Sequence, residues 1–182
     1  EASSQVMLLQ KNKVTHVIVV QLVSGAICFL REARKFKLNV PLLGTGWTCN
    51  EDTIKISGEA AKNYYGVHAY SSWYDNTPGM AKLREITMKL NPKKKDYAKT
   101  YTKGWLCAMI LEEGMKRAGR NLDSESLVAA IETFKNFDTG GVSGYINYGP
   151  NERMGGEYLR MYKADVENNK LIPISDWRKA AH

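Results

Sequence analysis

The sequence predicts an α/β protein, and three consecutive segments carry that prediction. Val14 to Val20 is a mostly β-branched apolar run, typical of a strand buried on both faces. A helical pattern follows, with Ser24 as its cap and apolar residues at helical spacing: Ile27, Leu30, Ala33 and Phe36. Val40 to Leu43 is a second short strand. A strand–helix–strand unit of this kind is almost always parallel and right-handed.

A ligand site is expected at one edge of the sheet that this unit forms. The loops Gln21–Ser24 and Gly44–Trp47 follow the two strands. Because the carboxyl ends of parallel strands meet at the same edge, both loops should open there. Open α/β sheets bind their ligands at that edge.

The rest of the chain alternates further helices and short strands. A helix is expected over 3–11, and Asn50 can cap another that runs to Ile56. Thr77-Pro78 is a helix-start signal for a helix that stops at Asn91-Pro92. The remaining helices are expected over 97–118 and 123–134, and the remaining strands over 65–70, 145–148, 158–164 and 170–174.

Length and composition indicate a globular chain of one domain or two small ones. It has 182 residues, of which 43% are hydrophobic and 25% are charged. No apolar run approaches the ~20 residues of a membrane span, and residues 1–5 do not resemble a signal peptide. The net charge of +7 invites a nucleic-acid interpretation. Outside Lys93–Lys95 the basic residues are mixed with glutamate, so a solvated basic surface and no nucleic-acid partner are expected.

No catalytic or metal-binding motif stands out. The histidines are isolated and the cysteines lack metal-ligand spacing: His16, His68, His182, Cys28, Cys49 and Cys107. Gly44-Thr45-Gly46 resembles the start of a dinucleotide fingerprint, but it lacks the third glycine and the helix directly after it. We therefore expect no catalytic residue, no cofactor and no metal.

Aromatic residues gather where the strands are expected to end. Trp47, Tyr70, Trp73 and Tyr74 lie at or just past predicted strand ends, and Trp105 opens the long helix. Aromatic side chains in such places commonly line apolar pockets that carry a polar group.

Several stretches together resemble a known family. They are Tyr65–Tyr70 followed by Thr77-Pro78, then Tyr101–Ala108 with Glu112–Gly119, and finally Phe137–Ile146. Upstream, Phe29–Arg34 and Val40–Gly44 fit the same pattern. In order and spacing they resemble the carboxyl-terminal part of the type I periplasmic solute-binding proteins, in the branched-chain amino acid receptor branch.

The resemblance implies an α/β clamshell with parallel sheets flanked by helices, which closes on a small ligand by hinge motion. Residues 1–70 and 157–182 would belong to the second lobe, 75–156 to the first, and 71–76 to a hinge crossover. The amino-terminal half of the family's fold has no counterpart here. The implied partners are a small-molecule ligand and the membrane permease of an ABC-type uptake system, at a periplasmic or extracellular location.

Two other interpretations remain open at this point: a small doubly wound α/β enzyme, and the ligand-sensing domain of a signalling receptor. Incomplete lobes would also leave strand edges uncovered, so an oligomer or swapped assembly is expected.

Together, the strand ends and the resemblance predict a set of residues that border one cleft: Gln21, Leu22, Thr45, Trp47, Tyr70, Trp73 and Trp105. The resemblance also implies that amino-acid-binding members hold the ligand's ammonium with an acid in the loop after the second strand. Here no acid follows until Glu51, so an uncharged or anionic ligand is expected, unless Asp75 supplies the charge.

Overall fold

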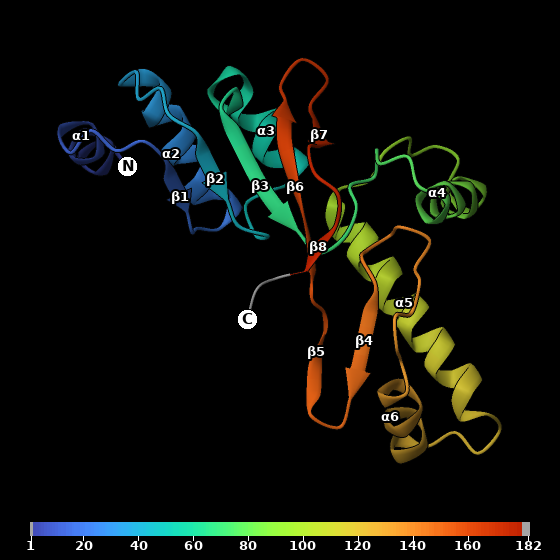
Figure 1. The fold of residues 1–182 in the computed structure, drawn as a ribbon. Helices are drawn as coiled ribbons and strands as arrows, with labels where there is room; N and C mark the ends of the chain where they lie inside the picture. The colour runs from blue at the N-terminus through green and yellow to red at the C-terminus, as the bar shows by residue number, and fades with distance from the viewer. Residues whose placement is uncertain (1, 180–182) are drawn as a thin grey trace. The chain divides into compact units, whose positions relative to one another are not determined.

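The computed structural model describes residues 2–179, which form two compact units (Figure 1). Among the described residues, unit 1 comprises 2–68 and 160–176, and unit 2 comprises 69–159 and 177–179. The division into the two lobes expected from the sequence stays a prediction.

Unit 1 is a mixed sheet with helices, in the strand order β1-β2-β3-β6-β7. The first three strands are parallel, whereas β6 and β7 run antiparallel to their neighbours. The predicted parallel strand–helix–strand unit is thus confirmed. In chain order the elements are α1 (Ser3–Lys11), β1 (Val17–Val19), α2 (Val23–Lys35), β2 (Leu42–Gly44), α3 (Glu51–Ser57), the 3₁₀ helix η1 (Gly58–Ala61), β3 (Tyr64–His68), β6 (Tyr158–Asp165) and β7 (Lys170–Pro173).

The structure differs from the sequence prediction at the start of α2. Leu22, not Ser24, is the N-cap residue, and no side chain caps this helix. The extended backbone of Leu22 lets its carbonyl accept the first helical bond, from the Ala26 N–H, at 3.0 Å. Ser24 therefore lies inside the first turn. Strand β1 is also shorter than the predicted run.

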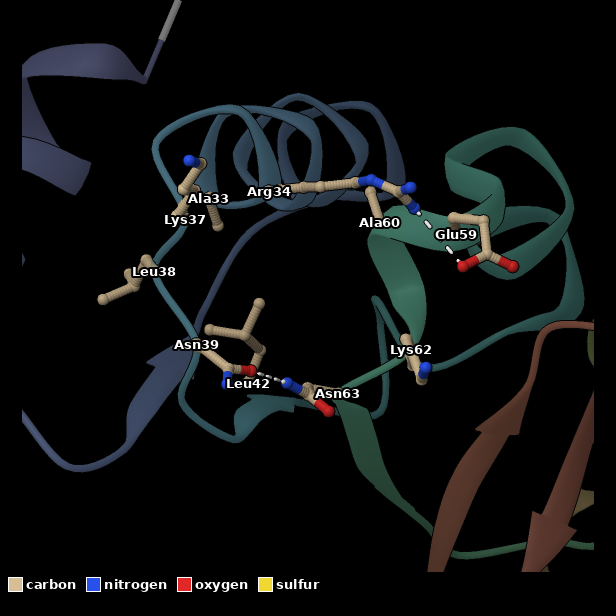
Figure 2. Close-up of a pocket in the computed structure, with 10 residues that line it drawn as sticks. All are labelled: Ala33, Arg34, Lys37, Leu38, Asn39, Leu42, Glu59, Ala60, Lys62 and Asn63. Atoms are coloured by element: carbon tan, nitrogen blue, oxygen red, sulfur yellow. Dashed lines mark hydrogen bonds and ion pairs between the residues drawn. The ribbon is translucent and has the colours of Figure 1, made fainter.

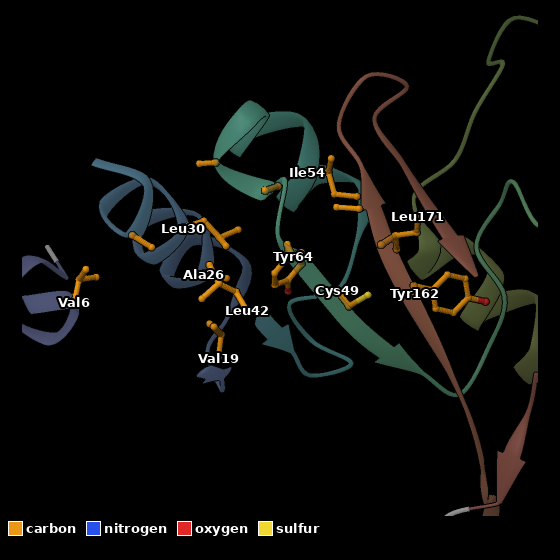
Figure 3. Close-up of a cluster of buried hydrophobic side chains, with 14 residues drawn as sticks. Val6, Val19, Ala26, Leu30, Leu42, Cys49, Ile54, Tyr64, Tyr162 and Leu171 are labelled. Carbon is orange, nitrogen blue, oxygen red and sulfur yellow. The ribbon is translucent and has the colours of Figure 1, made fainter. Parts of the chain in front are cut away.

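One face of the unit 1 sheet carries the core (Figure 3). Side chains alternate along a strand, so Val19, Leu42 and Tyr64 point to the same face as their buried neighbours from the helices. Those neighbours come from α1, α2 and α3, and they include Val6, Ala26, Leu30 and Ile54. Ile18 points to the other face and is 70% exposed.

Unit 2 is built from three helices and short antiparallel strands. The helices are α4 (Pro78–Leu90), α5 (Lys99–Ala118) and α6 (Ser124–Glu132), and the strands are β4 (Ile146–Gly149), β5 (Glu152–Gly156) and β8 (Arg178–Lys179). Strand β4 pairs with β5, and β8 pairs with residues 158 and 159 of β6. The sequence did not predict β5, because its two glycines lower the strand signal.

Local capping explains where these helices begin and end. The Thr77 hydroxyl accepts a bond from the Met80 N–H, with Pro78 in the first turn, as the sequence predicted. Asp123 and Ser126 form a reciprocal capping box on α6. Helix α5 ends at Gly119, whose φ of 78° suits glycine.

Candidate functional site

Two short loops lie at one edge of the unit 1 sheet. Gln21 and Leu22 follow β1, and the loop from Thr45 to Asn50 follows β2. Because β1 and β2 are parallel neighbours, with Val19 opposite Gly44, the two loops lie side by side. We call this region the carboxyl edge, and four of the seven predicted site residues share it: Gln21, Leu22, Thr45 and Trp47.

Large apolar side chains are exposed at the carboxyl edge. Trp47 is 71% exposed, Val20 71% and Leu22 67%. The Trp47 loop is a tight turn, since the N–H groups of Thr48 and Cys49 both donate to the Thr45 carbonyl at 3.0 Å. The edge therefore presents an indole on an ordered loop, the kind of residue that dominates many binding contacts.

Polar side chains pack against this turn and hydrogen-bond to its backbone. A methyl group at Gly44 would lie 1.9 Å from the Tyr64 hydroxyl oxygen, so only glycine fits there. The Thr53 hydroxyl donates to the Thr48 carbonyl at 2.6 Å, and the Asn50 side chain caps α3. Burial raises the pKa of the Tyr64 phenol well above its ordinary value, and the neighbouring Thr48 side chain offsets only part of that effect. The phenol is therefore neutral at physiological pH.

Two polar residues at the carboxyl edge were not among the predicted site residues. Glu51, in the first turn of α3, is only 8% exposed. His68 ends β3, contacts the Cys49 carbonyl through its Nε2 and lies edge-on to the Tyr162 ring at 5.9 Å. Their signal in the sequence was position alone, as Glu51 follows the second predicted strand and His68 lies within the predicted strand 65–70. A buried carboxylate is therefore present near the loop that the sequence suggested was free of acids.

The Thr45 hydroxyl is a further polar group at this edge. Its oxygen is buried and has no hydrogen-bond partner among the described residues. A buried hydroxyl without a partner costs about 1–3 kcal/mol.

Unit 2 contains the other three predicted site residues, in different surroundings. Trp73 is 3% exposed and packs on Tyr97 and Tyr101, with ring centroids 4.9 and 6.1 Å away. Tyr70 packs against this same cluster, and its backbone forms an isolated antiparallel β-bridge with Ser143. Trp105, also packed on it, lines a surface hollow of about 490 Å³ between α4 and α5. Trp73 thus serves the core of unit 2, and only Trp105 of the three lines that hollow.

A basic pocket of about 340 Å³ lies at the other end of β2 (Figure 2). Its floor is apolar, with Ala33 and Leu42 buried, and its rim carries Arg34, Lys37 and Lys62. Arg34 makes a long ion pair with Glu59 at 3.5 Å, and both side chains are more than half exposed. Because Arg34 lies in the last turn of α2, its charge also complements the helix dipole. These two interactions account for Arg34 on the rim without a ligand.

Within residues 2–179, no group of histidine, cysteine, aspartate or glutamate side chains is placed to hold a metal ion. None of the helices described is both long enough and apolar enough to cross a membrane.

Comparison with known proteins assigns the family. A family model described as periplasmic binding protein matches residues 1–170. No curated protein matches the chain.

Solved structures share the fold at low sequence identity. A branched chain amino acid ABC transporter protein from Thermus thermophilus, solved with bound valine, has a TM-score of 0.85 at 22% identity, covering 100% of this chain and 50% of its own. A fatty acid ABC transporter substrate-binding protein from Thermomonospora curvata has a TM-score of 0.81 at 19% identity, covering 99% of this chain and 47% of its own. An ABC transporter substrate binding protein from Aeropyrum pernix has a TM-score of 0.82 at 17% identity, covering 99% of this chain and 48% of its own. The chain thus spans about half the length of these structures.

Proposed function

Because the chain belongs to the periplasmic binding protein family, we propose that it is part of the solute-binding component of an ABC-type uptake system. Its role is to bind a small organic molecule and present it to a membrane permease, in the periplasm or outside the cell, without chemical conversion. The family match over residues 1–170 supports this role more than any other observation.

The carboxyl edge of unit 1 is the part of the chain that we assign to ligand contact. The exposed indole of Trp47 and the exposed Leu22 side chain favour a ligand with an apolar body. An aromatic or aliphatic acid or amide has such a body together with one polar end. That Tyr70, Trp73 and Trp105 border the same cleft stays a prediction.

A free amino acid is the second candidate ligand, and one observation favours it. Glu51 is a buried carboxylate at the carboxyl edge, and a ligand ammonium group needs a paired negative charge when it leaves water. The two candidates differ in their dependence on this residue, which gives a direct test.

Calorimetry on the purified chain with leucine, valine, hexanoate and benzoate tests both proposals. For an acid ligand, Trp47→Ala should weaken binding about tenfold or more, as expected for a central aromatic contact, while Glu51→Gln should leave it nearly unchanged. For an amino acid ligand, Glu51→Gln should weaken binding at least as much as Trp47→Ala.

Ile56→Ala is the matched control, since Ile56 is half exposed on α3 and outside the carboxyl edge. If heat signals from all four compounds are absent, or if Ile56→Ala weakens binding as much as Trp47→Ala, the assignment of the carboxyl edge is wrong. Turnover of any of the four compounds would contradict the non-enzymatic role.

A further inference from the structure

Three aromatic side chains wall a pocket of about 250 Å³ in unit 2: Tyr145, Tyr158 and Trp177. The centroids of the Tyr145 and Tyr158 rings are 6.1 Å apart, and the ring planes are inclined at 80°. Rings at nearly a right angle form a corner, whereas parallel stacked rings would leave no room between them. Tyr145 is 48% exposed, so the corner can be reached from solvent.

Backbone geometry brings these rings together from separate parts of the chain. Gly144 lies against Tyr158, because a methyl group at Gly144 would be 2.3 Å from the Tyr158 Cβ. In the pairing of β8 with β6, Tyr158 lies opposite Lys179. Side chains alternate along an extended chain, so Trp177, two residues before Lys179, turns to the same side as Tyr158. The pocket is thus a product of the fold and not of one loop that packs on itself.

The charge at this pocket is opposite to that of the whole chain. The chain carries a net charge of +7, yet among the described residues that line the pocket Asp138 alone is charged. The Gly140 N–H donates to the Asp138 Oδ1 at 2.8 Å, which orients the carboxylate. The Lys179 ammonium on β8 is paired with Glu157 at 3.1 Å. The pocket therefore favours a cation over an anion.

The walls also indicate the kind of cation. Aromatic rings attract a cation through the negative face of their π system, and quaternary ammonium groups are commonly held in this way. The Ser143 hydroxyl, which belongs to the lining, already donates to the Gly144 carbonyl at 2.7 Å. The pocket is smaller than the ~300–1,000 Å³ that drug-sized ligands occupy. A small cation covered by methyl groups needs no hydrogen bond and matches these walls better than a strongly hydrated primary ammonium.

From these observations we propose that Tyr145, Tyr158 and Trp177 form a site for a trimethylammonium group, such as that of choline. The three rings enclose the methyl groups, and the Asp138 carboxylate supplies the opposite charge. All of these residues belong to unit 2, whereas the ligand contact proposed above belongs to the carboxyl edge of unit 1. The site goes beyond the proposed transport function, and binding there does not require it.

Titration of the isotope-labelled 182-residue chain with choline, followed by NMR, tests the proposal. The control ligand is the neutral analogue of choline in which a carbon atom replaces the charged nitrogen. Choline should shift the amide signals of Gly144 and Tyr145 and the indole signal of Trp177. The neutral analogue should bind at least about tenfold more weakly, because it lacks the attraction to the rings and to Asp138.

Variants at the half-exposed Tyr145 separate the ring from its hydroxyl group. Tyr145→Leu should weaken choline binding about fivefold or more, whereas Tyr145→Phe keeps the ring and should retain binding within about twofold. Asp138→Asn should weaken the binding of choline and leave that of the neutral analogue unchanged. Tyr65→Leu, in β3 of unit 1, is the matched control and should change neither.

A trimethylammonium group can belong to a free solute or to a lipid headgroup. Sedimentation with phosphatidylcholine vesicles distinguishes these two sources. Co-sedimentation that Tyr145→Leu abolishes would assign a lipid headgroup to the site, and choline binding without co-sedimentation would assign a free solute.

Any of four results would overturn the proposal. These are no shift of the three signals with choline, equal affinity for choline and its neutral analogue, equal weakening by Tyr145→Phe and Tyr145→Leu, and weakening by Tyr65→Leu as large as that by Tyr145→Leu. A failure of the proposed transport function would appear instead in the calorimetry of Trp47→Ala and Glu51→Gln, so the two proposals fail separately.

Discussion

At the scale of single residues, two glycines differ in what an added methyl group would meet: neighbouring side chains at Gly44 and open space at Gly104. Gly44→Ala should destabilise the protein by about 1–3 kcal/mol, because its methyl group would overlap Tyr64 and Thr48. Gly104 lies inside α5 with open space around it, so Gly104→Ala should instead stabilise by about 1 kcal/mol. Urea denaturation of both variants measures the two changes. Equal effects would show that the close approach at Gly44 is absent in solution.

The capping carboxylate of Asp123 gives a pH-dependent prediction at the same scale. Backbone and side-chain hydrogen bonds from Ser126 hold its pKa below the ordinary value of 3.8. A lowered folded-state pKa means that the stabilisation is complete above the ordinary value and is lost as pH falls through the folded one. The start of α6 should therefore fray only under acidic conditions below about pH 4.

The Ser126 amide shift, followed by NMR during an acid titration, reports this transition. Asp123→Asn keeps a capping oxygen but does not titrate, so its Ser126 shift should not change over that range. A variant that titrates like the original would mean that another group causes the transition.

At the scale of elements, the start of α4 depends on one hydroxyl. Thr77→Ala should cost about 1 kcal/mol, since the Met80 N–H loses its acceptor, while Thr77→Ser should retain nearly full stability. Thermal unfolding of the three proteins measures this order. If the serine and alanine variants are equally destabilised, the methyl group of Thr77 matters and the cap does not.

Local capping signals explain why the start of α4 could be predicted and the start of α2 could not. Thr77-Pro78 combines a capping side chain with a preset φ, and both are local properties of the chain. At α2 the sequence offered Ser24 as the cap, yet Leu22 begins the helix without a side-chain bond. Strand β1 ends at Val19, and its direction sets where the helix can pack.

At the scale of the whole molecule, the uncovered face of the unit 1 sheet should be visible in solution. Ile18, Leu43, Tyr65, Lys163 and Ile172 form one row across five strands. The Lys163 ammonium lies 5.8 Å from the Tyr65 ring centroid, so the row joins apolar surface to a cation. The folded chain should therefore bind the anionic dye anilinonaphthalene sulfonate.

Ile18→Asn combined with Ile172→Asn should lower the dye fluorescence severalfold, whereas Ile56→Asn, on α3, should not. Unchanged fluorescence in the double variant would place the dye elsewhere.

The oligomer or swapped assembly expected from the sequence stays a prediction, and light scattering of the purified chain tests it. An oligomer that forms through this face would bind less dye at high protein concentration.

The sequence alone determined the order of the α-helices and of the strands other than β5 and β8, and the edge on which the β1 and β2 loops open. These depend on local signals: the β-branched run, the helical spacing from Ile27 to Phe36, and the caps at Asn50, Thr77 and Asp123. The family resemblance, confirmed over residues 1–170, followed from the order of these segments.

Only the tertiary structure decided which polar and aromatic side chains are buried. Trp47 and Trp73 both follow predicted strands, yet one is 71% exposed and the other 3%, because Trp73 alone meets Tyr97 and Tyr101. Glu51 and His68 likewise became candidates through burial at the carboxyl edge. Burial is a property of contacts between residues far apart in the chain, and no local pattern encodes it.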